Sequence, residues 1–291
     1  MEFIDVVGGR LGVHELAAGD GPVVLAAHGI TANALSFAAL ASDLPAGTRL
    51  LAPDLRGRAC SAGITGPWGV AQHADDLIAV VDAYGVDRFT LLGHSMGAFV
   101  AAVTALRYPD RVEKVVLVDG GVGFPVPPET DIDALLTAVI GPAMTRLSMS
   151  FPDRASFHGL MARNPAVAEV LALDPSAADR LSAYLDHDLV AAPDGTLHSS
   201  CVLDAIRNDG AAVTAEPESV LAVRELPVPG TLLWAPRGLM NQTPGLYTEQ
   251  LLAAAELPDT LRVQEVPDCN HYSIVFADHA RRAIVDGLVG R

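Results

Sequence analysis

The segment Gly93-His94-Ser95-Met96-Gly97 holds the side chain best suited to chemistry, a serine flanked by glycine two positions before and two positions after it. This spacing matches G-x-S-x-G, in which the serine stands on a sharp, strained turn from a strand into a helix and its neighbours must be small. The apolar β run 88–92 precedes the motif and the helical run 98–106 follows it, so the context is the required one. We therefore predict Ser95 as a nucleophile; the alternative is an inert serine in an ordinary tight turn.

A serine nucleophile needs an imidazole base within hydrogen-bond reach, and the base needs a third group to orient it. Of nine histidines, His271 fits best, because it follows the last strand pattern and precedes the final helix. We expect His73, His94 and His279 to pack locally or lie on a helix surface. Solvated helix faces are expected for His158, His187 and His198. No histidine forms HxH or HExxH, so no metal site is predicted.

Strands alternate with helices in the first third of the chain, which predicts βαβ units and a parallel sheet. Apolar β runs lie at 23–27, 49–52, 88–92 and 112–118, and helical spacing appears at 35–44, 71–84 and 98–106. From 122 to 226 the pattern becomes helical, is broken by prolines and has few strand signals. Strand character returns at 230–234 and 261–266, with helices at 246–255 and 274–289. The pattern predicts a sheet domain interrupted by a helical insertion.

Four motifs together resemble the α/β-hydrolase superfamily: His28-Gly29-Ile30-Thr31, Pro53-Asp54-Leu55-Arg56-Gly57-Arg58, the Ser95 motif, and Asn270-His271. The resemblance implies an α/β-hydrolase fold, with a mostly parallel eight-stranded sheet flanked by helices. Ser95 would follow the fifth strand, and a helical cap would be inserted after the sixth. The expected division is a core of 1–121 and 227–291 with a cap of 122–226.

The resemblance also implies an oxyanion hole made of two backbone amides. One donor would be the N–H of Met96, directly after the nucleophile, and the other the N–H of Ile30, in the turn that carries the family's HG pair. Gly29 would let the backbone turn towards the site. His28 is expected to be structural.

The triad acid is where this sequence departs from most relatives. The usual slot after the seventh strand holds no Asp or Glu between Leu226 and Glu249, and Asn241 there cannot balance an imidazolium charge. Some superfamily members, haloalkane dehalogenases among them, carry the acid at the end of the sixth strand, where this chain has Asp119. Asp119 is therefore the predicted acid. Asp268 and a dyad supported by Asn241 or water are the alternatives.

Charge and composition narrow the partners. The 291 residues carry 35 acidic and 19 basic side chains, a formal net charge of −16, which disfavours nucleic acid and anionic membranes. The start has no signal-peptide pattern and no apolar run reaches a membrane span, so a cytoplasmic protein is expected. The three scattered cysteines suggest reduced thiols. Whether the chain forms a homodimer stays open.

These features predict a cofactor-free hydrolase that cleaves a carboxylic ester, thioester or lactone through an acyl-enzyme. Carbon–carbon bond hydrolysis, acyl transfer on the same triad, and a low-turnover ligand-binding or sensor protein are the alternatives. The substrate is expected to be small, apolar or neutral, in a mainly apolar cavity. The candidate substrate contacts are Thr31, His94, Trp68, Met144 and Phe157.

Overall fold

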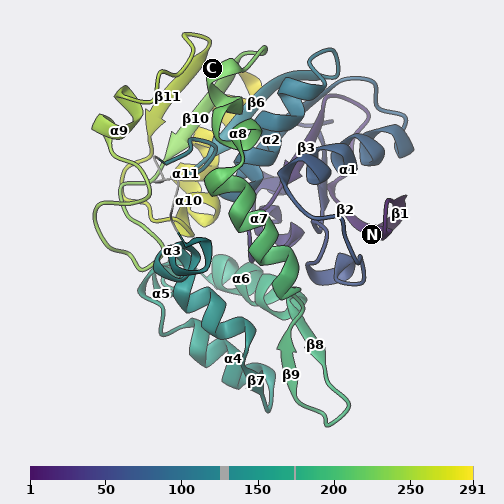
Figure 1. Ribbon diagram of the computed structural model, residues 1–291, viewed down its shortest axis with the longest axis vertical. Helices are drawn as coiled ribbons and strands as arrows, with labels where there is room; N and C mark the ends of the chain where they lie inside the picture. The colour runs from purple at the N-terminus through teal and green to yellow at the C-terminus, as the bar shows by residue number, and fades with distance from the viewer. Residues whose placement is uncertain (125–130, 174, 291) are drawn as a thin grey trace.

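A computed structural model describes residues 1–124, 131–173 and 175–290 (Figure 1). Its centre is an eight-stranded sheet with the strand order β1-β2-β4-β3-β5-β6-β10-β11. The strands β1 and β2 run antiparallel to their neighbours and all other pairs are parallel. This confirms the predicted fold class, with Ser95 directly after the fifth strand. The strands are β1 (Glu2–Val6), β2 (Gly9–Ala17), β3 (Val23–Ala27), β4 (Arg49–Pro53), β5 (Phe89–His94), β6 (Val112–Val118), β10 (Gly230–Trp234) and β11 (Leu261–Glu265).

The central strands β3, β5 and β6 are mostly apolar, as expected where helices cover both faces of a sheet. One layer of buried side chains joins Leu91 to the helices α1 (Val70–Ala83) and α2 (Met96–Arg107). The other joins Leu92 to α10 (Ser273–Phe276) and α11 (Asp278–Val289). The remaining core elements are α9 (Glu249–Ala253) and the short 3-10 helices η1 (Ala34–Phe37), η2 (Leu40–Ser42) and η3 (Ala59–Ser61).

Most of the insertion between β6 and β10 lies below the sheet in the view of Figure 1, drawn in teal and green, and we call this part the cap. Asn164 caps α5 by accepting a hydrogen bond from the Ala166 N–H, and Pro165 takes the first turn, where its missing N–H costs nothing. The prolines thus begin helices as well as break them. The cap elements are α3 (Ile132–Leu147), β7 (Ser150–Phe151), α4 (Arg154–Met161), α5 (Pro165–Leu171), α6 (Pro175–His187), β8 (Leu189–Ala191) and β9 (Leu197–Ser199).

Strands within the insertion were not predicted. In the described part of the cap, β7, β9 and β8 form a small antiparallel sheet in that order. These strands are two or three residues long, which is too short for an alternating pattern to stand out in the sequence.

The end of the insertion returns to the core. The helix α7 (Leu203–Ala215) contacts α3 in the cap and α1 in the core. Next, α8 (Pro217–Leu221) and η4 (Ala222–Glu225) pack against α2. The domain boundaries at 121/122 and 226/227 stay a prediction. Across the described residues, no helix combines the length and apolar character that crossing a membrane requires.

Candidate active site

Ser95 lies on a strained turn between β5 and α2, with φ 56° and ψ −122°. Its N–H donates to the carbonyl oxygen of Val118, 2.9 Å away, which ties the turn to β6. The flanking glycines are required by close packing, because a Cβ on Gly97 would lie 1.9 Å from the oxygen of Ala27. Gly120 is equally constrained, since its Cβ would lie 2.1 Å from the oxygen of Ser95. The motif therefore presents the serine at the carboxyl end of the sheet.

His271 and Asp119 come together although 152 positions separate them in the sequence. The Nδ1–H of His271 donates to Oδ2 of Asp119 at 2.7 Å, and both side chains are buried. Asp119 has φ 44°, and its Oδ1 accepts a second hydrogen bond from the Ala235 N–H at 3.1 Å. A carboxylate held from both sides fixes the imidazole tautomer, so the lone pair is on Nε2.

The alternatives to Asp119, namely Asn241 and Asp268, have other hydrogen-bond partners than the ring of His271. Asn241, in the usual slot, contacts Arg237 and Asn270. Asp268 is exposed, and its carbonyl oxygen accepts from Arg237. Of the three candidates, Asp119 is the one hydrogen-bonded to the ring of His271.

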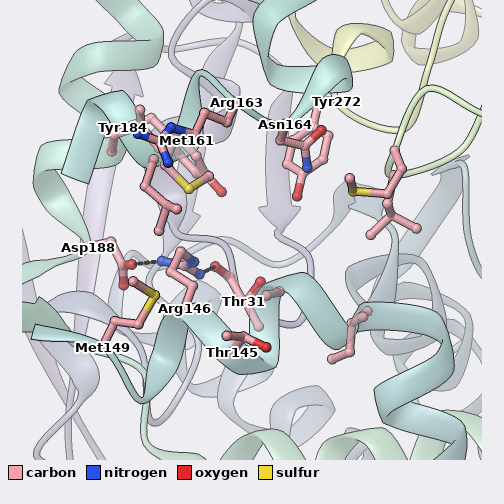
Figure 2. A pocket seen from close by; sticks show the side chains of 16 residues that line it. Thr31, Thr145, Arg146, Met149, Met161, Arg163, Asn164, Tyr184, Asp188 and Tyr272 are labelled. Carbon is pink, nitrogen blue, oxygen red and sulfur yellow. Dashed lines mark hydrogen bonds and ion pairs between the residues drawn. The ribbon is translucent and has the colours of Figure 1, made fainter. Parts of the chain in front are cut away.

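Ser95 and His271 line the same small cavity, of about 50 Å³, together with Ile30. A larger cavity of about 340 Å³ lies under the cap and shares part of its wall with the small one. Figure 2 shows the larger cavity. The residues that line both are Thr31, Ile140, Ala143, Tyr184, Leu239 and Tyr272.

The turn after β3 has its carbonyl oxygens held by side chains. The oxygen of Gly29 accepts from Nδ1–H of His28 at 2.8 Å, and that of Ile30 accepts from Nε–H of Arg58 at 2.9 Å. Within the described part of the chain, the amides of Ile30 and Met96 donate to no protein acceptor. Two such amides beside Ser95 are suited to bind a developing oxyanion.

His28 is a structural residue of this turn. Its Nε2 accepts from the Leu55 N–H at 2.9 Å, so the ring is neutral and joins the turn after β3 to the turn after β4. Complete burial lowers the pKa of His28 to about 3.

Arg58 connects both predicted oxyanion residues to the insertion. Besides Ile30, its guanidinium contacts the sulfur of Met96 at 3.9 Å and Oδ2 of Asp209 on α7 at 2.5 Å. His73 reaches the same carboxylate oxygen at 2.9 Å. Burial alone would raise the pKa of Asp209, but His73 and Arg58 hold it below its ordinary value.

The larger cavity has a mostly apolar wall with one buried ion pair, between Arg146 of α3 and Asp188 at the end of α6 (Figure 2). Arg146 also donates to the carbonyl oxygen of Thr31 at 3.3 Å. The hydroxyls of Ser199 and Ser200 donate to Asp188. The apolar wall includes Met149, Leu160, Met161 and Leu185.

The predicted substrate contacts divide into two groups. Thr31 and His94 line the small cavity. Trp68, Met144 and Phe157 are not among the described residues that line either cavity, and this corrects the prediction. Phe157 is fully buried against Phe151 in the cap interior, Met144 packs in the cluster of Ile140 and Ile206, and Trp68 covers Gly57. Of the three, Phe157 belongs to the cap interior, whereas Met144 packs in the same cluster as Ile30 and Leu239, which line the small cavity.

Several residues that line the two cavities were not among the predicted substrate contacts. Tyr272 had a usable signal, since it directly follows the predicted base. Arg146, Tyr184 and Asp188 had none, because they meet only once the cap is folded.

Comparison with known proteins places this geometry in a family. The family model described as the alpha/beta hydrolase fold matches residues 22–185, more than half of the chain. The uncharacterized protein Rv2715 of Mycobacterium tuberculosis is 35% identical over 107 residues, which are 36% of this chain and 30% of that protein. The 2-(acetamidomethylene)succinate hydrolase of Mesorhizobium japonicum is 32% identical over 111 residues, 38% of this chain and 40% of that protein.

The matched segments thus span well under half of these curated relatives. The crystal structure of E-2-(acetamidomethylene)succinate hydrolase superposes with a TM-score of 0.78 at 23% identity, covering 100% of this chain and 98% of that one. This likeness supports the fold and not a substrate. With its sheet order, its strained serine turn and the match over residues 22–185, the chain belongs to the alpha/beta hydrolase fold family.

Proposed function

We propose that this protein hydrolyses a carboxylic ester, thioester or lactone through an acyl-enzyme formed on Ser95. One observation carries the proposal: Ser95 and His271 line one cavity, and Nδ1 of His271 lies 2.7 Å from Oδ2 of Asp119. A hydroxyl and an imidazole that line one cavity, with a buried carboxylate bonded to the far nitrogen of the imidazole, are the three groups that acyl transfer to serine requires.

In the proposed mechanism, Nε2 of His271 takes the proton of Ser95 as Oγ attacks the acyl carbon. The amides of Ile30 and Met96 hold the oxyanion, and Asp119 stabilises the imidazolium through Nδ1–H. His271 then gives the proton to the leaving group. A water, deprotonated by the same imidazole, releases the acid and regenerates Ser95.

The cavities indicate the kind of substrate. The 50 Å³ space beside Ser95 is suited to the reacting acyl group, and the 340 Å³ space under the cap offers apolar walls for the rest of the molecule. Of the two arginines in this wall, Arg146 is buried and its charge is balanced by Asp188, whereas Arg163 is an exposed residue whose charge is solvated. We therefore infer a neutral, partly apolar substrate.

The test is a rate survey over p-nitrophenyl esters of increasing chain length and a panel of lactones, with Ser95→Ala as the blank. We expect Ser95→Ala to lower kcat by a factor of about 10⁴ to 10⁶. The matched control is Ser42→Ala, which removes the hydroxyl of a 3-10 helix serine that bonds the oxygen of Ala39. That variant should keep the wild-type rate.

A fluorophosphonate probe separates enzyme from sensor. Fast labelling that Ser95→Ala abolishes, together with ester turnover, supports the proposal. Turnover that survives Ser95→Ala would refute it. Labelling with tight retention of ligand and no turnover would favour the sensor alternative, and cleavage confined to carbon–carbon bonds would favour that hydrolase class.

A further inference from the structure

Four side chains with metal-binding donors converge outside the two cavities of the active site. They are His14 on β2, Asp54 after β4, Cys60 on η3 and His187, the last residue of α6. Their donor atoms all lie within 4.8 Å of one another. The sequence predicted no metal site, because these residues come from four elements and show no close spacing.

His187 corrects a sequence expectation. We predicted a solvated helix face for it, but its side chain is only 17% exposed and its Nε2 lies 2.8 Å from Oδ2 of Asp54. Nε2 of His14 lies 3.3 Å from the same oxygen, and the two rings meet edge to face with centroids 4.9 Å apart. The Nε2 atoms of both imidazoles therefore lie beside the same carboxylate oxygen, Oδ2 of Asp54.

The carboxylate of Asp54 is the fixed centre of this cluster. It is fully buried, its Oδ1 accepts from the Ala34 N–H at 2.9 Å, and its Oδ2 also accepts from the Cys60 N–H at 3.2 Å. Such outer hydrogen bonds hold a ligating carboxylate in one orientation.

Two imidazoles, a thiol and a carboxylate make a donor set typical of zinc. Zinc at 2.0–2.3 Å from each donor puts tetrahedral ligand atoms roughly 3.3–3.7 Å apart. On zinc binding, the longest separation in the cluster, up to 4.8 Å, must therefore shorten by roughly 1 Å, and the 2.8 Å contact between Nε2 of His187 and Oδ2 of Asp54 must lengthen by roughly 0.5 Å. We propose that His14, Asp54, Cys60 and His187 bind one Zn²⁺ ion.

The position of the site indicates a structural role for the ion, between the core and the cap. His14, Asp54 and Cys60 belong to the core, and His187 belongs to the cap. The next residue, Asp188, pairs with Arg146 in the wall of the larger cavity. Bound zinc thus ties α6 to the core sheet beside the cavity wall.

The experiment is titration of chelator-treated, full-length protein with Zn²⁺ by calorimetry and with Co²⁺ by absorption. We expect one Zn²⁺ per chain and, with Co²⁺, the near-ultraviolet charge-transfer band of a cobalt–thiolate bond. His187→Ala should weaken zinc binding at least about tenfold, because mutating even the outer hydrogen-bond partners of metal ligands lowers metal affinity about 10–100-fold. Cys60→Ser should remove the charge-transfer band.

Two controls show that the ion sits at this cluster. Cys269→Ser/His279→Ala removes a cysteine–histidine contact outside the cluster, in which sulfur and Nε2 are 3.2 Å apart, and should bind zinc normally. His158→Ala removes a partly buried histidine–aspartate pair with Asp186 and should also bind normally.

A second readout covers variants that fold poorly. Zinc should slow amide hydrogen exchange in α6 and raise the Tm of the wild type, while the difference between zinc-free and zinc-loaded Tm should vanish in His187→Ala. The proposal is overturned if the wild type binds no zinc, if His187→Ala binds it equally well, or if cobalt gives no thiolate band. The first result would leave a metal-free hydrogen-bonded contact between core and cap.

Discussion

The carboxyl edge of the sheet and the cap wall hold their functional residues by different means. At the sheet edge, Ser95 and Asp119 have positive φ angles, and each is fixed by backbone hydrogen bonds to a neighbouring strand. In the cap wall, Arg146 is fixed by the side chain of Asp188, and both residues lie on elements far apart in sequence. The first region is therefore specified by backbone conformation and strand contacts, and the second by a contact between two side chains.

This difference decides what each region tolerates. At Gly93, Gly97 and Gly120, an added Cβ would lie only 1.9–2.2 Å from a backbone oxygen. These positions therefore admit only glycine, whatever the substrate. A side-chain pair can be replaced by another pair of similar volume without moving the backbone. We therefore expect changes at the sheet edge to abolish chemistry, and changes in the cap to alter stability or substrate choice.

The largest expected effect is that of Asp119→Asn. The amide keeps the volume but cannot balance the imidazolium and favours the wrong tautomer, so kcat should fall by about 10⁴-fold. Steady-state kinetics on the best ester from the survey measures this. The matched control is Asp268→Asn, an exposed alternative acid, which should leave kcat within a few-fold. A near-normal rate for Asp119→Asn would mean that another group orients His271.

Arg58→Met tests the buried connection between the predicted oxyanion residues Ile30 and Met96 and the helix α7, which carries Asp209. It leaves Asp209 without its guanidinium partner in the interior, and we expect a loss of about 3–5 kcal/mol in the free energy of unfolding. Urea unfolding measures the loss. The double variant Arg58→Met/Asp209→Leu should recover part of it, because no unpaired carboxylate remains.

The control for this pair is Arg107→Met, which removes a partly exposed ion pair with Glu218. Pairs of that kind contribute about 0–1 kcal/mol. If Arg58→Met and Arg107→Met cost the same, the buried network is not what holds α7 on the core.

The comparison also explains which features could be predicted from sequence. The mostly parallel sheet with Ser95 after its fifth strand, and the candidates His271 and Asp119, follow from apolar runs, glycine spacing and the resemblance they carry. Phe157 was misassigned because helical spacing marks a buried face without saying what the face covers. The contact between His187 and Asp54 spans 133 positions, so no window of sequence contains it.

Ala143→Leu tests the cap as a determinant of substrate choice. Ala143 on α3 lines both cavities, so a larger side chain there reduces the space for the part of the substrate that extends from one cavity to the other. We expect kcat/KM for long-chain p-nitrophenyl esters to fall about tenfold, with little change for the acetate, since a single methylene is worth about 10–200-fold in a pocket. Ala134→Leu, on the exposed side of α3, is the control. Equal losses for all chain lengths would place the acyl chain elsewhere.

The smallest expected effect is a pH dependence of stability that comes from His94. Burial, and next the nearby His271, lower the pKa of His94, and its Nε2–H donates to the carbonyl oxygen of His271 at 3.0 Å. The folded protein therefore keeps this ring neutral, while the unfolded chain takes up a proton below about pH 6.5. Stability from this residue is complete above that pH and is lost as the pH falls.

Between pH 7.5 and 6.0 the loss from His94 should be about 0.8 kcal/mol. His94→Gln keeps a donor for the oxygen of His271 but does not titrate, so its pH-dependent loss in urea unfolding should be smaller than that of the wild type by this amount. His28, the other imidazole that lowers the pKa of His94, is unchanged in the variant and cancels in the difference. Identical pH profiles for the two proteins would mean that His94 is protonated in the folded state, which would also place a positive charge beside His271.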